Sequence, residues 1–380
     1  MIIGFYAPLK SPDHPVPSGD RRMAQLLMKI LEKIGHEVFL LSSLRSWEGK
    51  GNEQKQQQIR HQATAELTRI RKSGLAARLD LVFVYHLYHK APDWIGIELC
   101  HEQVIPYVLV EASYAPKQAG GPWHSGHVQA KKCIGRANAI ISVNPVDSHC
   151  VGEIARNDCH IGHIMPFLEA VEENSKSKFE LRERLCSQNN LDQQCVWLIA
   201  VAMMREGDKM SSYRMLASSV SKIASRNWQL VVIGDGECST QVVQIFENVA
   251  ARCLFTGKLS PAAVADWLDA CDVYVWPSVN EAYGLGLLEA VAHGLPTIAC
   301  SYGGVGQIVE HGFNGILVKP DDCASYTEHL DALVSNAEAR TRFGENATQK
   351  FLRDHTLEKA KKQVDAVLEE ASGSKNQRSG

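Results

Sequence analysis

Short apolar runs alternate with amphipathic segments along the whole chain. A short apolar run bounded by polar residues is typical of a buried β-strand. In the first half such runs occupy residues 1–7, 37–41, 80–88, 106–110, 139–143 and 163–166. Between the first two, apolar residues recur every third or fourth position from Met23 to Ile34. This spacing predicts a helix over residues 21–34 that ends at Gly35.

The second half repeats the alternation after a break in composition. Residues 168–194 are charged and polar, which indicates a linker. We expect strands at residues 196–202, 229–233, 249–256, 272–276, 297–300 and 315–318, with helices between them. The chain is expected to end with helices at about 324–335, 337–342 and 357–371 and a disordered tail at 373–380.

Strands that alternate with helices in this way predict two domains, each built on a parallel, doubly wound sheet. We place the first domain at residues 1–167 and the second at residues 195–350. Open sheets of this kind bind ligands at the carboxyl ends of their strands. The glycine-bearing and charged loops follow the predicted strands, so we expect a site in a cleft between the two sheets.

The most informative stretch is residues 277–296, which read PSVNEAYGLGLLEAVAHGLP. It follows a buried strand and places a glycine-bearing segment between Glu281 and Glu289, just before an apolar helix. Backbone N–H groups at such a helix N-terminus receive phosphate oxygens well. Glu289 lies among apolar positions, where a carboxylate is costly unless paired, and a ribose diol would serve as its partner. Glu281 taken alone is equally consistent with an exposed loop acid.

Two cations, Arg205 and Lys209, follow the strand at residues 196–202. An arginine fork and a lysine point charge at this place would neutralise a pyrophosphate without a metal ion. Taken alone, such residues more often form surface salt bridges. The sequence has no Asp-x-Asp and no histidine pair at a metal-binding spacing, so no metal site is expected.

Three residues of the first half also follow predicted strands. Gly19 comes after a proline-rich loop, where it would let the backbone approach a ligand closely or would serve as a plain turn glycine. His86 and Glu111 lie at the ends of the strands at 80–88 and 106–110. A lone histidine is more often structural than functional, so both roles stay open for His86.

Composition narrows the class of protein. The 380 residues are 45% hydrophobic and 22% charged, and the net charge of −3 gives no sign of nucleic-acid binding. The 11 cysteines include no C-x-x-C pair and are expected to be reduced. The first 165 residues carry 19 Lys and Arg against 15 Asp and Glu. That balance suits an anionic acceptor or a membrane surface as well as an ordinary solvated face.

The start of the chain and the lengths of its apolar runs indicate where in the cell the protein is expected. The chain begins directly with strand residues, which leaves no room for a signal peptide. No apolar run approaches the ~20 residues that span a bilayer. We therefore expect a cytoplasmic protein whose membrane contact, if present, is peripheral and on the inner face of the cytoplasmic membrane.

Four elements of the second half occur together in an order that resembles the retaining nucleotide-sugar glycosyltransferases of family four. They are residues 231–236, residues 255–257, the E-x7-E segment from Glu281 to Glu289, and the glycine turn at 303–304 that precedes residues 312–318. The resemblance covers residues 195–335 well. In the first half it is limited to Pro17–Gly19 with its following helix and to Gly35–Val38.

The resemblance implies the GT-B architecture, an α/β fold of two Rossmann-like domains that face one another across a cleft. It implies that a C-terminal helix, at about 351–372, packs back on the first domain. Arg205 and Lys209 would hold the donor diphosphate, Glu289 would bind the ribose, and Glu281 would face the donor sugar. The donor would also meet the chain at Gly19, Gly234, Gly257, Tyr283, Gly284, Leu285 and Gly286.

The chain departs from the family pattern at several points. Arg205 and Lys209 are four positions apart rather than five, Asp20 stands where a second glycine is common, and Gln307 replaces a frequent glutamate. The histidine usual in the first domain is absent, and Glu111 lies near its place. We expect either His86, one strand earlier, or Glu111 to take that role.

The resemblance thus implies a hexosyltransferase that acts on a UDP-type or GDP-type sugar and retains the anomeric configuration. The acceptor would be a hydroxyl of a glycan or a lipid-linked molecule in cell-surface glycan or glycoconjugate synthesis. The leaving phosphate would itself help to deprotonate the acceptor, so no protein nucleophile, cofactor or essential metal is expected. Two alternatives stay open: a GT-B nucleotide-sugar epimerase and a non-catalytic protein that binds sugar nucleotides.

Overall fold

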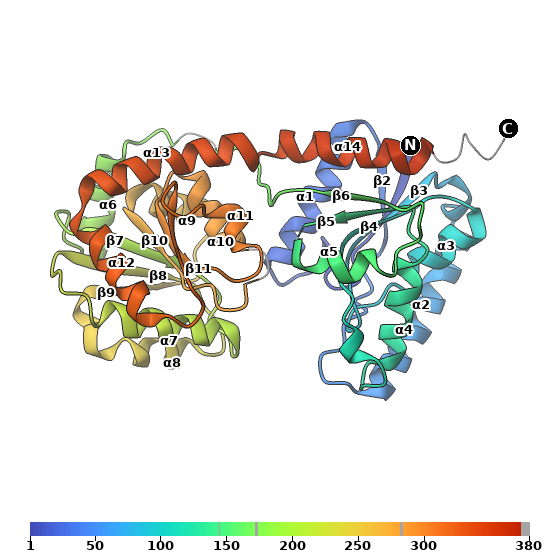
Figure 1. Cartoon of the computed structure of the whole chain (residues 1–380), viewed down its shortest axis with the longest axis horizontal. Coiled ribbons are helices and arrows are strands. Elements are labelled where there is room, and N and C mark those ends of the chain that lie inside the picture. Colours follow the sequence, from blue (N-terminus) through green and yellow to red (C-terminus); the bar gives the residue numbers. More distant parts are fainter. Residues whose placement is uncertain (144, 172–173, 282–283, 374–380) are drawn as a thin grey trace. The chain divides into compact units, whose positions relative to one another are not determined.

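The computed structural model describes residues 1–143, 145–171, 174–281 and 284–373. The chain divides into two compact units (Figure 1). The first comprises Met1–Met165 together with Leu357–Gly380, and the second comprises Pro166–Thr356. Each unit is built on a six-stranded sheet of its own, so the predicted fold class is confirmed.

The sheet of the first unit has the order β2-β1-β3-β4-β5-β6, and its neighbouring strands are parallel. The strands are β1 (Ile2–Tyr6), β2 (Glu37–Ser42), β3 (Leu81–Leu87), β4 (Tyr107–Ala112), β5 (Ala139–Ser142) and β6 (His160–His163). The two central strands, β3 and β4, are almost wholly buried. Their continuous apolar sequences are what a strand covered by helices on both faces requires.

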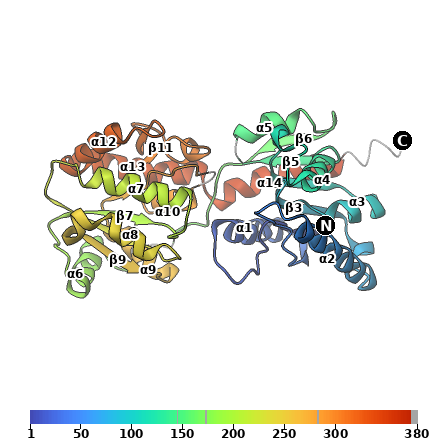
Figure 2. The ribbon, with the colours of Figure 1, turned by 90° about the horizontal axis from the view of Figure 1, so that it is seen from below.

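The helices of the first unit lie on both sides of this sheet (Figure 2). They are α1 (Gly19–Ile34), α2 (Glu53–Lys72), α3 (Gly96–Gln103), α4 (His124–Ile134), α5 (Pro145–Gly152) and α14 (Leu357–Gly373). The C-terminal helix α14 packs against α1, β5 and β6. Its buried residues Val364, Val367, Leu368 and Ala371 recur at helical spacing, which explains why the end of the chain belongs to the first unit.

The sheet of the second unit has the order β12-β11-β10-β7-β8-β9 and is also parallel. Its strands are β7 (Val196–Val201), β8 (Trp228–Ile233), β9 (Cys253–Gly257), β10 (Val273–Val275), β11 (Thr297–Cys300) and β12 (Gly315–Val318). The strand order reverses between β7 and β10. In doubly wound sheets, ligands bind beyond the carboxyl ends of the strands at such a reversal.

The helices of the second unit flank its sheet, with α7 and α8 on one side and α9 and α13 on the other (Figure 1). They are α6 (Lys178–Asn189), α7 (Asp208–Val220), α8 (Ser239–Ile245), α9 (Pro261–Ala270), α10 (Leu285–Ala292), α11 (Val305–Ile308), α12 (Cys323–Ser335) and α13 (Ala337–Asp354). Helix α10 packs against α13. The stretch expected to carry the donor site therefore rests on a layer of helices.

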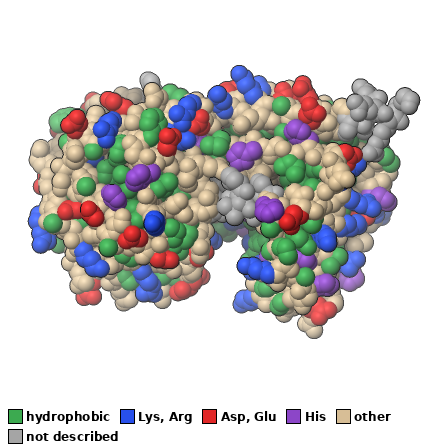
Figure 3. Space-filling model, viewed as in Figure 1, with side chains coloured by type: hydrophobic (Ala, Val, Ile, Leu, Met, Phe, Trp, Pro, Cys, Tyr) green, Lys and Arg blue, Asp and Glu red, His purple; other side chains and the backbone are tan. Residues whose placement is uncertain are grey.

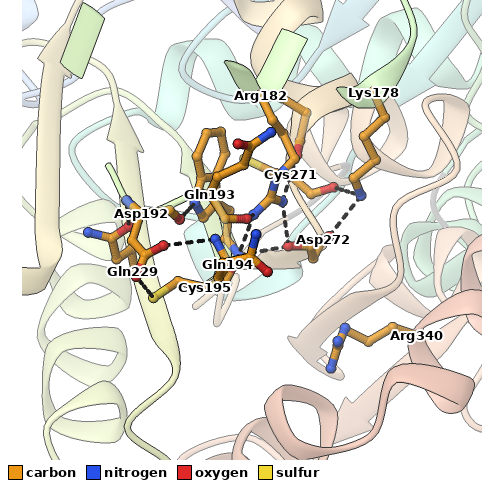
Figure 4. Close-up of polar contacts among 12 residues, drawn as sticks. Lys178, Arg182, Asp192, Gln193, Gln194, Cys195, Gln229, Cys271, Asp272 and Arg340 are labelled. Carbon is orange, nitrogen blue, oxygen red and sulfur yellow. Dashed lines mark hydrogen bonds and ion pairs between the residues drawn. The ribbon is translucent and has the colours of Figure 1, made fainter. Parts of the chain in front are cut away.

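The segment predicted to be a linker contains helix α6, which is part of the second unit. Ser177 and Glu180 form a capping box at its start. Arg182 of α6 pairs with Asp272 at 2.8 Å and donates to the carbonyls of Gln193 and Cys195, and Lys178 reaches Asp272 at 2.8 Å (Figure 4). Charged residues of this segment thus attach it to the amino edge of the sheet.

Three further elements differ from the sequence-based expectation. The last strand of the first unit is His160–His163 rather than residues 163–166, because a polar edge strand lacks the apolar run used to find it. Helix α4, which begins at His124, is not among the elements expected from the sequence. Helix α13 continues to Asp354, well beyond the predicted end at 342. The expected disorder at 373–380 lies, from residue 374 onward, outside the described residues.

The chain enters and leaves the second unit at neighbouring points. Leu168 N donates to the carbonyl of His355 at 3.0 Å, and Leu168 and Thr356 form an isolated parallel bridge. His355 is fully buried, and its Nδ1 lies 2.7 Å from the carbonyl oxygen of Pro166. Hydrogen bonds therefore close the two ends of the unit on each other.

Acidic and basic side chains are interspersed over the face shown in Figure 3, rather than gathered by sign. Among the described residues, no helix is both long and apolar enough to cross a bilayer. The described residues also contain no group of three or more His, Cys, Asp and Glu side chains arranged to hold a metal ion.

Candidate functional site in the second unit

The loop after β10 is held in an unusual conformation. Ser278 and Asn280 both have left-handed backbones, with φ of 60° and 48°. Such angles are uncommon for residues other than glycine and gather at functional sites. The loop is fixed to α7, because Val279 N donates to Ser212 Oγ at 2.9 Å and Asn280 Nδ2 donates to Asp208 Oδ1 at 3.0 Å. The residue that follows, Glu281, is thereby placed against the start of α7.

Glu281 and Lys209 form a direct ion pair between Oε2 and Nζ. Both side chains are largely buried, with exposed fractions of 21% and 18%. The Lys209 ammonium also lies 5.5 Å from the centre of the Trp276 ring. The structure thus brings together two residues that sequence analysis assigned to one site, and it gives Lys209 a salt bridge that is not a surface one.

Arg205 lies in the loop between β7 and α7, four residues before Lys209. Its side chain is exposed, and it makes no hydrogen bond or ion pair with any described residue. The surface salt bridge considered for Arg205 is therefore not formed among the described residues. An arginine fork beside a structured loop remains available to an anionic ligand.

Helix α10 begins at Leu285, directly after the E-x7-E loop. Its N-cap, Gly284, is left-handed, with φ of 71°, and no side chain among the described residues caps the helix. The first N–H groups of a helix have no partner inside it, so this end can receive an anion. A Cβ on Gly286 would lie 2.7 Å from Tyr274 Oη, so glycine allows the helix start to pack on β10. Tyr283 lies outside the described residues.

The two glutamates of the E-x7-E segment lie near one buried phenol. Tyr274 is fully buried and donates to the carbonyl of Val201 at 3.2 Å. Burial raises the pKa of Tyr274 well above its usual value, and the negative charges of Glu289 and Glu281 raise it further. Glu289 itself is half-buried in the middle of α10. The carboxylates therefore flank the start of α10, as the spacing predicts.

The glycines predicted to meet the donor lie at the carboxyl ends of β8 and β9. Gly234 has φ of 153°, and a Cβ there would lie 1.9 Å from the carbonyl oxygen of Ala202. Its N–H donates to the carbonyl of Gly257 at 3.0 Å. Gly234 lets β8 turn closely past the end of β7. Gly257, at the end of β9, borders open space instead.

The predicted residues of the first unit form a separate group. His86 and Glu111 have left-handed backbones, with φ of 63° and 56°, at matching positions near the ends of the paired strands β3 and β4. His86 Nδ1 lies 3.1 Å from Asp20 Oδ1. Burial acts to raise the pKa of Asp20, but the hydrogen bond and charge of His86 bring it below its usual value. Gly19 is the first residue of α1.

Sequence reasoning missed three participants in these contacts. Asp20 was noted only as a departure from a glycine pattern, yet it holds His86. Ser212 and Asp208 of α7 fix the loop before Glu281. No local pattern marks these residues, because each acts through a partner that is distant in sequence. The backbone angles of His86 and Glu111 have no sequence signal either.

The second unit is similar in sequence to a known protein family. Residues 196–336 match a family described as "Glycosyl transferases group 1". The match is confined to the second unit and shows what that unit is similar to. The matched residues contain Arg205, Lys209, Glu281 and Glu289, so the predicted resemblance to family-four glycosyltransferases is confirmed for this glycosyl transferase region.

Curated relatives of the glycosyl transferase region include several named enzymes. N-acetyl-alpha-D-glucosaminyl L-malate synthase of Bacillus anthracis is 30% identical over 141 residues, which are 37% of this chain and 36% of the relative. A D-inositol 3-phosphate glycosyltransferase of Xylanimonas cellulosilytica is 33% identical over 125 residues, 31% of this chain and 30% of the relative. The chain thus spans well under half the length of these relatives.

Solved structures resemble both units. Sucrose-phosphate synthase from Thermosynechococcus elongatus superposes with a TM-score of 0.77 at 16% identity, over 98% of this chain and 99% of that one. The Anabaena protein HepE in complex with UDP-glucose gives a TM-score of 0.71 at 16% identity, over 97% and 99% of the two chains. At this identity the likeness shows the fold, and it confirms the prediction of two Rossmann-like domains.

Proposed function

We propose that the protein is a retaining glycosyltransferase that moves a hexosyl group from a nucleotide diphosphate sugar to an acceptor hydroxyl. The observation that carries the proposal is the largely buried Lys209–Glu281 pair beside the uncapped start of α10. A cation, a carboxylate and free N–H groups in one place suit a sugar joined to a diphosphate. The match of residues 196–336 to glycosyl transferases supports this assignment.

The donor would be held by residues of the second unit. Its diphosphate would meet Arg205, Lys209 and the N–H groups at Leu285 and Gly286. Glu289 would accept hydrogen bonds from the ribose hydroxyls, and Glu281 from the hydroxyls of the sugar. The complex of HepE with UDP-glucose shows that a protein of this fold binds such a donor. A UDP-type or GDP-type sugar is therefore the donor class that we propose.

Bond cleavage would leave a diphosphate that gains negative charge. Preorganised cations and N–H groups lower the barrier of such a step because they stabilise the charge as it develops. Lys209 is already oriented by Glu281, so little reorganisation is needed when the donor binds. We assign no protein nucleophile and no step to a metal ion.

The acceptor would be chosen by the first unit. Beyond His86, an aromatic run leads through Tyr88 and His89 to Trp123, with ring centres 5.6, 5.3 and 5.8 Å apart. Lys90 lies 4.3 Å from the Trp123 ring centre. Rings and cations together suit a sugar that carries negative charge. We propose a glycan or lipid-linked acceptor in glycoconjugate synthesis, reached at the inner face of the membrane by peripheral contact.

The proposal is tested by thermal-shift screening of UDP, GDP and ADP, followed by incubation of the stabilising nucleotide's sugars with and without candidate acceptors. We expect one nucleotide to raise the melting temperature and its sugar to be transferred without inversion. An epimerised free nucleotide sugar, formed from donor alone, would support the epimerase instead. Binding without turnover on any acceptor, together with full function of the Lys209→Ala protein in cells, would support a non-catalytic role.

A further inference from the structure

A cavity of about 260 Å³ lies in the first unit at the amino edge of its sheet. It is formed by the turns that lead from α3 into β4, from α4 into β5 and from α5 into β6. Residues from all three turns line it, among them Ile105, Asn138 and Arg156. The cavity therefore lies between three helix-to-strand turns rather than beside a single loop.

The cavity lies at the opposite edge of the first unit's sheet from His86 and Glu111. Tyr107, which lines it, is the first residue of β4, whereas Glu111 lies near the other end of that strand. Four residues of extended strand separate the two by roughly 13 Å. Arg205, Lys209 and Glu281 belong to the second unit. An occupant of the cavity would therefore be neither the donor nor the acceptor of the proposed reaction.

The polar lining of the cavity consists of hydrogen-bond donors. The exposed side chains of Arg136 and His101 make no hydrogen bond or ion pair with any described residue. Asn138 uses Oδ1 to accept from Tyr107 N at 3.0 Å, which leaves the two Nδ2 hydrogens without a described partner. Among the described residues that line the cavity, none is acidic. Donors without matching acceptors favour an anion.

Arg156 adds a second guanidinium, which is already occupied. It forms a fork with Asp158, whose Oδ2 lies 2.6 Å from Nη2. The charge of Arg156 is therefore balanced by Asp158, and the net positive charge of the lining comes from Arg136.

The rest of the lining is apolar. Ile97, Ile105 and the ring of Tyr107 form this part, and the Tyr107 hydroxyl is engaged elsewhere, because it donates to Asp93 at 2.6 Å. A free inorganic ion would leave this surface uncovered. An organic anion would cover it and gain from its burial.

The turn that contributes Ile105 to the cavity carries backbone strain. Val104, between α3 and Ile105, is left-handed with φ of 55°, a conformation that a β-branched residue rarely adopts. Its side chain is 81% exposed. Glycine or asparagine would end α3 at lower cost, and strain of this kind gathers at ligand sites. The strain and the unpaired donors are independent observations at one place.

We propose that this cavity binds a small organic monophosphate as a ligand separate from both transfer substrates. The phosphate oxygens accept from Arg136, His101 and the Asn138 amide. The carbon skeleton packs on Ile97, Ile105 and Tyr107. This assignment does not depend on the proposed function.

Calorimetric titration with phenyl phosphate tests the proposal, because this probe joins a monophosphate to a rigid apolar ring. We expect binding to the full chain at millimolar concentration or tighter, and we expect it to persist when UDP is saturating. The Arg136→Ala/His101→Ala protein should bind about tenfold or more weakly, since charged hydrogen bonds are lost. Lys131→Ala, an exposed change in the last turn of α4, should bind as the wild type does.

Three results would overturn the assignment. They are no binding of phenyl phosphate to the wild type at millimolar concentration, equal binding by the Arg136→Ala/His101→Ala protein, and loss of binding when UDP is added. Arg136 and His101 are exposed, so their replacement leaves the fold intact, and circular dichroism melting curves verify this. Phenol should not bind, because it lacks the phosphate, and tight binding of phenol would also contradict the proposal.

Discussion

Lys209 and Glu281 are 72 positions apart in the chain and pair directly, with about one-fifth of each side chain exposed. The carboxylate orients the ammonium before any ligand arrives. A bound diphosphate would accept hydrogen bonds from the same ammonium, which Glu281 would keep in place. In the proposed donor complex, the pair would lie between the diphosphate and the sugar, and this role can be tested by changing each residue.

Replacement of Lys209 by alanine is expected to lower kcat/KM by about 100-fold or more, because a preorganised charge at the leaving group is lost. Glu281→Gln should have an effect of similar size. The double variant should lose much less than the product of the two single effects, since the residues act as a unit. Steady-state kinetics measure this, with the exposed Lys319→Ala as the control. Additive losses would contradict coupling between the two residues.

Either His86 or Glu111 is proposed to take the place of the family's usual first-domain histidine, and kinetic measurements on variants can distinguish the two residues. We expect His86→Ala to lower kcat by about tenfold to a hundredfold, because its backbone and its contact with Asp20 aim the ring at the strand end. Asp20→Asn should lower kcat less and shift the pH profile. Glu111→Gln serves as the comparison. A larger loss for Glu111→Gln than for His86→Ala would reverse the assignment.

Gly234 is expected to tolerate no side chain. A Cβ would lie 1.9 Å from the Ala202 carbonyl oxygen, so Gly234→Ala must displace backbone, and the melting temperature should fall by several degrees or more. Gly257→Ala is the matched control, because its φ of 70° is also left-handed but its Cβ would meet open space. Thermal denaturation of both variants checks this. An equal fall in melting temperature for both variants would show that backbone strain, rather than the contact of the added Cβ, causes the loss of stability.

Arg182 is expected to be the main attachment of α6. Its guanidinium lies over the Trp197 ring at 4.1 Å, and its partner Asp272 has a pKa below its usual value, because the charges of Lys178 and Arg182 outweigh the effect of burial. Removal of one partner of a buried pair costs about 3 kcal/mol or more. Urea unfolding of Arg182→Ala should show such a loss.

The matched control for Arg182 is Arg184→Ala on the same helix. Arg184 pairs with Asp266 at 2.7 Å, with side chains 33% and 28% exposed. Such a pair contributes about 1 kcal/mol or less. Equal losses for the two variants would mean that α6 is held by its apolar contacts rather than by the Arg182 network.

His355 makes stability depend on pH. Burial lowers its pKa from 6.5 to about 4, against the opposite effect of its contact with the Pro166 carbonyl. The unfolded chain takes up a proton near pH 6.5, whereas the folded protein does so only near pH 4. Stability is therefore full above pH 6.5 and falls as the pH drops toward 4, by about 3 kcal/mol. Urea unfolding of the wild type and of His355→Gln across this pH range tests this prediction. If the free energy of unfolding had the same pH dependence in both proteins, the prediction would be contradicted.

The elements that sequence predicted well are those whose signal is local. Every strand of the second unit has a short apolar run, and the E-x7-E spacing marks the start of α10. Helix α6 was missed because its capping box and Arg182 act within a charged segment, and Asp272, the partner, lies 90 positions away. Strand β6 was misplaced because an exposed edge strand needs no apolar run.

The candidate site was predictable in its residue types but not in its connections. Glycines and acidic residues of loops can be identified directly in the sequence. The Lys209–Glu281 contact and the Asp20–His86 contact cannot, because they depend on how strands and helices bring distant segments together. The left-handed backbones at His86 and Glu111 could not be expected, because a single histidine or glutamate carries no local signal for that conformation. Long-range pairing and local strain are the two properties that no short pattern encodes.

The hydrogen bonds that join Leu168 to His355 and His355 to Pro166 have a consequence for engineering. A polypeptide of residues 166–356 would begin and end at adjacent points that already bind each other. We expect such a fragment to fold by itself, because its contacts form one compact unit. The remainder, residues 1–165 joined to 357–380 by a short linker, would carry its own last helix with it. The second unit is thus inserted in the sequence between two segments of the first unit.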